Sequence, residues 1–189
     1  TEGGFEFLGK RYSRLATETK AAVELDPRIA EIYESNFRAP CVVKDIRDLD
    51  AKDLPSHDVM TGGFPCQSFS MVAQNPPRLG HDDERGRLYF EMCRLLLAHR
   101  PQVFIAENVK GLLSANQKQA FPLLLEEFRQ CGYHIHWDLL DAADYGVPQR
   151  RQRVFIVGFR NLTASTSFKF PRPVADKYRS VMGDVLHPR

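Results

Sequence analysis

Short apolar runs and longer amphipathic segments alternate along most of the chain. Compact apolar runs, several of them rich in β-branched residues, predict strands at 21–25, 41–43, 58–61, 103–106, 133–140 and 153–159. Apolar residues at helical spacing predict helices over 27–37, 88–98 and 121–130. This alternation predicts an α/β fold with a mostly parallel, doubly wound sheet that ends in an antiparallel pair.

Other segments fit this pattern less well. Residues 3–16 hold apolar side chains at loose helical spacing, and residues 71–86 form a long polar stretch without periodicity. A loop of that length in a compact domain is usually functional or disordered. The glycines at 62 and 63 predict a flexible turn after the strand at 58–61, and residues 169–184 predict an irregular exit segment.

The composition is that of one globular domain. The chain has 189 residues, of which 43% are hydrophobic and 26% charged, and its net charge of +2 neither requires nor excludes nucleic acid. We find no bilayer-spanning apolar run and no signal-peptide pattern, and the four cysteines form no Cys-x-x-Cys pair. A reducing cytoplasm fits this pattern best. His134 and His136 would share one strand face, but no third ligand is close in sequence, so we expect no metal site.

The reactive candidate is Cys66. For an arbitrary cysteine a buried structural role is the better interpretation, because free cysteines are among the most buried residues. Cys66, however, follows the predicted strand at 58–61 and is fixed by Pro65, at a place where α/β proteins carry reactive groups. Its thiolate would be a strong nucleophile near neutral pH.

Polar groups also end the other predicted parallel strands. Glu24, Asp45 and the pair Glu107-Asn108 each follow an apolar run. Taken singly, each acid is more simply a solvated strand end or a helix cap. In doubly wound folds, however, the ligand crevice lies beyond the carboxyl ends of the strands, and an acid after the second strand suits a ribose diol. Together these residues predict a binding site.

Several motifs stand in one order along the chain. They are Glu24-Leu25-Asp26, Asp45-Ile46, Gly63-Phe64-Pro65-Cys66-Gln67-Ser68-Phe69-Ser70, the segment 83–88, Glu107-Asn108-Val109, the segment 144–148 and Gln149-Arg150-Arg151-Gln152-Arg153. In this order the chain resembles the cytosine-C5 DNA methyltransferases, particularly bacterial modification methylases, over nearly its whole length. The resemblance implies the Rossmann-like fold of S-adenosylmethionine-dependent methyltransferases, with S-adenosyl-L-homocysteine as a product and double-stranded DNA as partner.

The resemblance also implies catalytic roles. Cys66 would add to carbon 6 of a cytosine, so that carbon 5 can attack the methyl sulfonium. Glu107 would neutralise ring nitrogen 3, which requires a carboxyl kept protonated, as burial would favour. Asn108 would brace this loop. Arg151 and Arg153 would point to the same side of a strand, with Arg153 the better candidate for the cytosine carbonyl oxygen, although alone they would indicate a solvated basic face.

The implied cofactor contacts come from two strand ends. Glu24 would bind the ribose and Asp45 the adenine amino group, with Leu25, Ile46 and Leu88 as apolar neighbours. Many relatives carry a tryptophan at the position of Leu25, so this chain keeps an apolar wall but loses stacking.

The implied DNA contacts come from the loop that follows. Phe64 and Pro65 would shape the boundary between cofactor and base, and residues 68–87 would close over the DNA after the target base has flipped out. Gln67 and Ser70 would then contact DNA near the vacated position.

Some parts of the implied enzyme are not in this sequence. The family's first cofactor motif is expected before Thr1 and its target-recognition domain after Arg189, so we expect residues 1–189 to form an incomplete catalytic domain with weak or no activity alone. A complementing subunit would supply the rest if the enzyme is naturally split. Because the missing first strand is central, its loss would leave two neighbours without a shared partner.

Two other functions stay open. A tRNA cytosine-C5 methyltransferase shares the fold and the thiol chemistry, although the Gly-Gly-Phe at 62–64 favours DNA. A non-catalytic relative could bind only DNA or an active subunit, although this chain keeps Cys66, Glu107, Asn108 and Arg153.

Overall fold

The computed structural model describes residues 5–7, 10–12, 17–37, 39–64, 88–115 and 118–174. Its strands are β1 (Phe5–Phe7), β2 (Lys10–Tyr12), β3 (Ala22–Glu24), β4 (Cys41–Val43), β5 (Val59–Gly63), β6 (Val103–Val109), β7 (His134–Asp141) and β8 (Gln152–Phe159). Its α-helices are α1 (Pro27–Phe37), α3 (Leu88–His99), α4 (Ala120–Gln130) and α5 (Leu162–Ser167), and short 3-10 turns form η1 (Ile46–Asp48), η2 (Ala51–Asp53), η5 (Lys110–Ser114) and η6 (Ala142–Tyr145).

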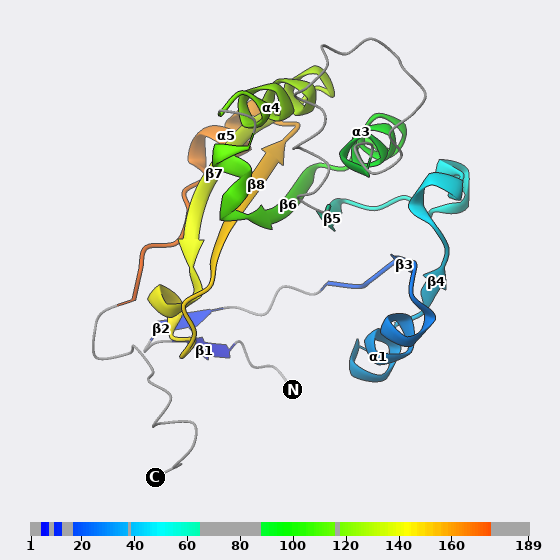
Figure 1. Ribbon diagram of the computed structural model, residues 1–189, viewed down its shortest axis with the longest axis horizontal. Coiled ribbons are helices and arrows are strands. Elements are labelled where there is room, and N and C mark those ends of the chain that lie inside the picture. Colours follow the sequence, from blue (N-terminus) through cyan, green and yellow to red (C-terminus); the bar gives the residue numbers. More distant parts are fainter. Residues whose placement is uncertain are drawn as a thin grey trace.

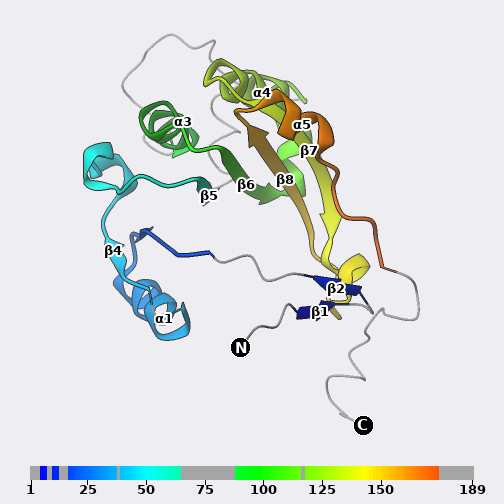
Figure 2. The ribbon, with the colours of Figure 1, turned by 180° about the vertical axis from the view of Figure 1, so that it is seen from behind.

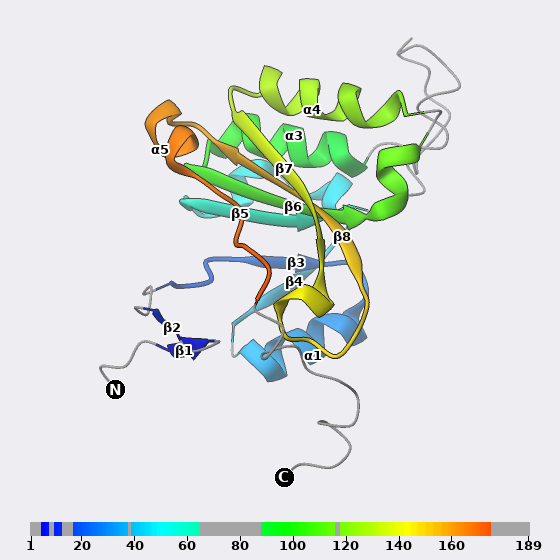
Figure 3. The same ribbon diagram turned by 90° about the vertical axis from the view of Figure 1, so that its left-hand side faces the viewer.

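The strands from β3 onward form one four-stranded sheet and one separate pair. The sheet has the order β5-β6-β8-β7, in which β5 and β6 are parallel and β8 is antiparallel to both of its neighbours. In this sheet β8 therefore runs against the other three strands, which confirms the predicted antiparallel final pair. β3 and β4 form a parallel pair that lies beyond β5, on the side away from β7 (Figures 1 and 3).

Helices cover both faces of this layer, as a doubly wound fold requires. α3 and α4 lie on one face, and α1 lies on the other, against β3 and β4 (Figures 1 and 3). Between the four-stranded sheet and its helices, Phe104 of β6, Ile156 of β8, Leu96 of α3 and Phe128 of α4 are fully buried in one cluster. Burial of such apolar side chains is the main driving force for folding of this layer.

β6 alternates strictly between its two faces. Phe104, Ala106 and Asn108 are buried, whereas Glu107 and Val109 are half-buried on the opposite face. The strand is longer than predicted, since it continues to Val109 instead of ending at Ala106. Glu107 and Asn108 are therefore strand residues, and their side chains point to opposite faces of the sheet.

Two of the predicted elements are wrong. Residues 3–16, expected to have helical spacing, contain the antiparallel pair β1–β2, and the Phe-Glu-Phe sequence of β1 has the two-residue period of a strand. Gly62 and Gly63, expected to form a flexible turn, are the last residues of β5. Within the described ranges the glycines with positive φ are Gly132, which follows α4 as predicted, and Gly146.

α5 is a helix that the sequence pattern does not predict, because five of its six residues are polar or small and Leu162 alone gives no apolar period. The Asn161 side chain caps it by accepting a hydrogen bond of 3.0 Å from the Ala164 amide. Ser165 is buried and lies 2.8 Å from Nε2 of His136 on β7 (Figure 2 shows α5 beside β7 and β8). His136 is thus engaged in packing.

The described residues also bear on membrane insertion and metal binding. No helix among them is both long and apolar enough to cross a membrane. Nor do these residues bring three potential metal ligands together.

The approach of β8 to β6 gives a test of this packing. Gly158 pairs with Phe104, and a Cβ at Gly158 would lie 2.1 Å from Cε1 of that buried ring. We expect Gly158→Ala to lower the free energy of unfolding by about 1–3 kcal/mol or more, as measured by urea denaturation. Gly111→Ala is the matched control, since its Cβ would meet Val109 at an ordinary 3.8 Å. Equal stability of the two variants would contradict the close packing.

Candidate active site

Several of the predicted site residues lie at or near the carboxyl ends of the parallel strands. In β3–β4 the register pairs Glu24 with Val43, and Asp45 follows two residues after β4. In β5–β6 the register pairs Gly63 with Glu107, and Phe64 follows β5 directly. Because parallel strands end at the same edge, each pair brings two site segments together.

Glu107 and Arg153 form an ion pair on the open face of the sheet. Arg153 faces Val109 across the β6–β8 ladder, so Glu107 is its diagonal neighbour on the same face. The Arg153 Nε donates to Oε1 of Glu107 at 2.7 Å. The two side chains are 21% and 39% exposed, respectively. The burial that we expected for the Glu107 carboxyl is thus not found, and a ligand can reach both groups.

Asn108 has the opposite environment. It is only 3% exposed, and its Nδ2 donates to the backbone carbonyl of Phe64 at 2.8 Å, while its Oδ1 accepts from the Val109 amide at 2.8 Å. A buried amide must be hydrogen-bonded in this way, because leaving it unpaired is costly. Asn108 therefore fastens the end of β5 to β6, two residues before Cys66.

Gly63 lies beside the Glu107 carboxylate, at a position that the sequence pattern assigned to a turn. A Cβ at this position would lie 3.5 Å from Oε2 of Glu107. The glycine therefore leaves the space beside the carboxylate open. Its pairing with Glu107 is the signal that could have identified it, and that pairing depends on the register of β5 and β6.

Glu24 presents a half-satisfied carboxylate at the end of β3. Its Oε1 accepts from the amides of Leu25 and Asp26, at 2.7 and 3.1 Å, while Oε2 has no hydrogen-bond partner within the described ranges. Leu25 is 64% exposed. An acceptor oxygen thus stands next to an exposed apolar side chain.

Asp45 is held by Arg47. The Arg47 backbone amide, Nε and Nη2 all donate to the carboxylate, at 2.9, 3.0 and 2.6 Å. These hydrogen bonds, from the side chain first and then the backbone, lower the pKa of Asp45 to about 2. Asp45 is therefore an anion at neutral pH, and a carboxylate offers about four acceptor positions, so one remains for an amino donor. Ile46 is half-buried beside it.

α3 connects the two groups of residues. Leu88, its first residue, is half-buried, and the Tyr89 ring lies 6.5 Å from that of the buried Phe64. Further along the helix, Arg94 donates to the carbonyl oxygen of Ile46 at 2.9 Å. The sequence pattern gave no indication of Arg94, since the two residues are far apart in the chain.

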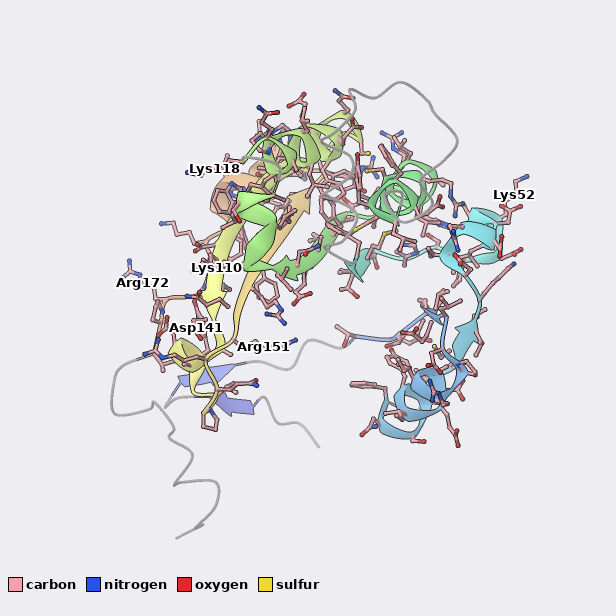
Figure 4. The ribbon with its side chains drawn as sticks, in the orientation of Figure 1. Lys52, Lys110, Lys118, Asp141, Arg151 and Arg172 are labelled. Carbon is pink, nitrogen blue, oxygen red and sulfur yellow. The ribbon has the colours of Figure 1, made fainter. Side chains whose placement is uncertain are left out.

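No observed contact joins Arg151 to the Glu107 carboxylate. β8 begins at Gln152, so Arg151 precedes the strand on which we expected it. Its backbone amide donates to the buried Asp141 at 3.0 Å, and its side chain is exposed (Figure 4 labels both). Asp141, which the sequence pattern also missed, fixes the start of β8 and caps η6.

Four predicted site residues lie outside the described residues. They are Pro65, Cys66, Gln67 and Ser70, together with the remainder of the loop 68–87.

Comparison with known proteins gives a family match over residues 3–189, to the C-5 cytosine-specific DNA methylases. The chain is 41% identical over 175 residues to the Type II methyltransferase M.FnuDI of Fusobacterium nucleatum, covering 93% of this chain and 50% of the relative. It is 42% identical over 158 residues to M.Bsp6I of Bacillus sp. (strain RFL6), covering 82% and 49%. The chain thus spans about half the length of the curated relatives it matches.

Solved structures give the same fold. A prophage-encoded E. coli protein described as a DNA modification methyltransferase aligns with a TM-score of 0.68 at 26% identity, over 90% of this chain and 48% of that one. The Dnmt2 methyltransferase of S. pombe aligns with a TM-score of 0.59 at 21% identity, over 89% and 45%, a likeness of fold alone. With the family match extending over nearly the whole sequence, this chain belongs to the C-5 cytosine-specific DNA methylase family.

Proposed function

We propose that this chain supplies the base- and cofactor-binding part of an enzyme that transfers a methyl group from S-adenosylmethionine to carbon 5 of a flipped-out cytosine in duplex DNA. The observation that carries the proposal is the accessible Glu107–Arg153 pair beside the end of β5. The strand end there is fastened by Asn108 immediately before the Pro65-Cys66 motif.

The two members of the pair suit one edge of the cytosine ring. Carbonyl oxygen 2 and nitrogen 3 are adjacent on that edge, so side chains that bind them must lie within hydrogen-bond distance of each other, as Glu107 and Arg153 do. Arg153 would donate to the oxygen, and Glu107 would bind nitrogen 3 as the protonated acid. The Cys66 thiolate would add to carbon 6, which makes carbon 5 nucleophilic, and carbon 5 would take the methyl group as S-adenosyl-L-homocysteine leaves. Loss of the carbon 5 proton to a base, with expulsion of the Cys66 thiolate, would then release the methylated ring. If Arg153 and Glu107 bind the base in this way, base binding must separate the two side chains, and the Glu107 carboxyl must gain a proton.

The residues at the ends of β3 and β4 fit the cofactor. Glu24 would accept from the ribose hydroxyls through Oε2, and Asp45 would accept from the adenine amino group. Leu25 and Ile46 would contact the ring. S-adenosylmethionine, when bound, supplies the electrophilic methyl group.

Other residues of the chain would contact DNA. A base inside a duplex cannot be reached, and extruding it costs a few kcal/mol. Gln67 and Ser70 would contact the DNA near the vacated position, and the exposed Arg151 suits a phosphate better than the base. Because its relatives are bacterial, such an enzyme would act in the cytoplasm, at the nucleoid.

We also propose that a strand from outside the described residues completes the sheet. β3 and β5 each pair with one described strand, and each leaves its other edge unpaired within that part of the chain. Such edges are usually covered. A strand between β3 and β5 would join the two sheets into one, and target recognition would rest on residues beyond this chain.

Covalent trapping tests the proposed chemistry. In the full-length protein, we expect duplex DNA with 5-fluorocytosine at the target to form an adduct in the presence of S-adenosylmethionine, and Cys66→Ser to form none. Denaturing electrophoresis measures the adduct, with tRNA as the competing substrate. No adduct with wild type would favour the non-catalytic alternative, and methyl transfer to tRNA alone would favour the tRNA enzyme.

A substitution of Arg153 distinguishes a catalytic role from a general effect on stability. We expect Arg153→Ala to lower kcat for methyl transfer by about 10²-fold, because it removes a donor aimed at the developing negative charge. Duplex affinity and unfolding should change little. Arg129→Ala is the control, since Arg129 also pairs with a half-exposed glutamate, Glu126 at 3.4 Å on α4. Near-normal turnover by Arg153→Ala would count against the assignment.

Hydrogen exchange tests the completed sheet. We expect the amides of β3 and β5 to exchange slowly in the full-length protein and faster in the 189-residue chain, which should methylate poorly. Mass spectrometry of peptides over 22–24 and 59–63 measures this. Equal exchange in the two proteins, or robust turnover by the short chain, would refute the missing strand.

A further inference from the structure

The link between the two groups of site residues is made by side chains of α3. The guanidinium of Arg94 bonds in two directions, since Nη2 donates to the Ile46 carbonyl at 2.9 Å and Nε donates to the Glu91 carboxylate at 2.7 Å. Glu91 is the more buried partner, with its side chain 18% exposed against 37% for Arg94. A planar guanidinium held by one carboxylate presents its other N–H groups in a fixed direction.

His99, five residues further along α3, makes a second hydrogen bond to a backbone carbonyl. Nε2 of His99 lies 2.7 Å from the carbonyl oxygen of Ala51, and its ring centroid lies 4.9 Å from that of His57, with the two rings tilted by 38°. Both hydrogen bonds end on the segment between β4 and β5. That segment contains Asp45 and Ile46 near its start.

The other face of α3 is fixed to the four-stranded sheet. Tyr89, Met92 and Leu96 are buried in the core, and Met92 Sδ would lie 3.4 Å from a Cβ on Gly62 of β5. Within the described residues β4 and β5 are not paired. Because α3 packs on the sheet and Arg94 donates to the Ile46 carbonyl, the position of the sheet determines where Ile46 lies.

We propose that Arg94, oriented by Glu91, is a positioning residue that sets where Asp45 and Ile46 stand relative to Glu107 and Arg153. This inference rests on the proposed function, because it concerns the adenine end of the cofactor. Arg94 itself acts through the Ile46 carbonyl and touches neither the cofactor nor the base. Its loss should loosen the adenine site while leaving the base site intact.

The test compares Arg94→Met, Arg94→Lys and Glu91→Gln in the full-length protein, with Arg129→Met as the control. Arg129 pairs with Glu126 at the same i, i+3 spacing on α4, but on the surface. We expect Arg94→Met to raise the KM for S-adenosylmethionine and the Kd for S-adenosylhomocysteine about tenfold, with kcat nearly unchanged. Arg94→Lys keeps a donor and should recover part of the loss, and Glu91→Gln should show a smaller loss.

The outcomes separate this inference from the proposed function. If wild type binds cofactor and Arg94→Met binds it equally well, or if Arg129→Met weakens binding as much, Arg94 does not position the site and the methyl-transfer proposal stands. A drop in kcat with unchanged KM would likewise overturn the inference. If folded wild type binds no cofactor at all, the proposed function falls, and this inference with it. Should Arg94→Met fail to fold, the Arg94→Lys and Glu91→Gln variants decide by the same readout.

Discussion

The strict alternation of β6 is the constraint on which the site depends. Adjacent residues of a strand face opposite sides of the sheet, so Glu107 and Asn108 cannot share one environment. β6 also lies between β5 and β8, which gives each of the two residues a partner on a different strand. Asn108 bonds to the end of β5 on the buried side, and Glu107 pairs with Arg153 of β8 on the open side. One dipeptide therefore performs two tasks.

The two contacts differ in what they contribute. The Asn108 amide is nearly inaccessible, so removal of its partners would leave a buried polar group unsatisfied at a cost of about 1–3 kcal/mol. The Glu107–Arg153 pair is partly solvated, and pairs of that kind contribute about 0–1 kcal/mol. Separating the two side chains of this ion pair therefore costs little of the stability of the fold. The buried Asn108 contact therefore contributes most to stability, whereas the partly exposed Glu107–Arg153 pair can be exchanged for other hydrogen bonds.

The sequence pattern was sufficient for features that depend on local periodicity. The helices over 27–37 and 121–130 lie within a residue of their predicted bounds, and the acids at the ends of β3 and β4 stand where the alternation put them. Features that depend on pairing were not accessible. The role of Gly63 follows from its register with Glu107, and that of Arg94 from a contact with Ile46 across the fold. Residues 3–16 were misassigned because short apolar segments fit both periods.

The distribution of the site over two strand groups has a consequence for how it can vary. The residues proposed for the cofactor lie at the end of β3 and around the start of η1, whereas Glu107 and Arg153 belong to β6 and β8. Hydrogen bonds from α3 join the two groups, and those bonds end on backbone carbonyls of Ile46 and Ala51. A backbone carbonyl is present whatever the side chain is. Side chains at the proposed cofactor site, such as Leu25, can therefore change without disturbing the geometry around Glu107 and Arg153.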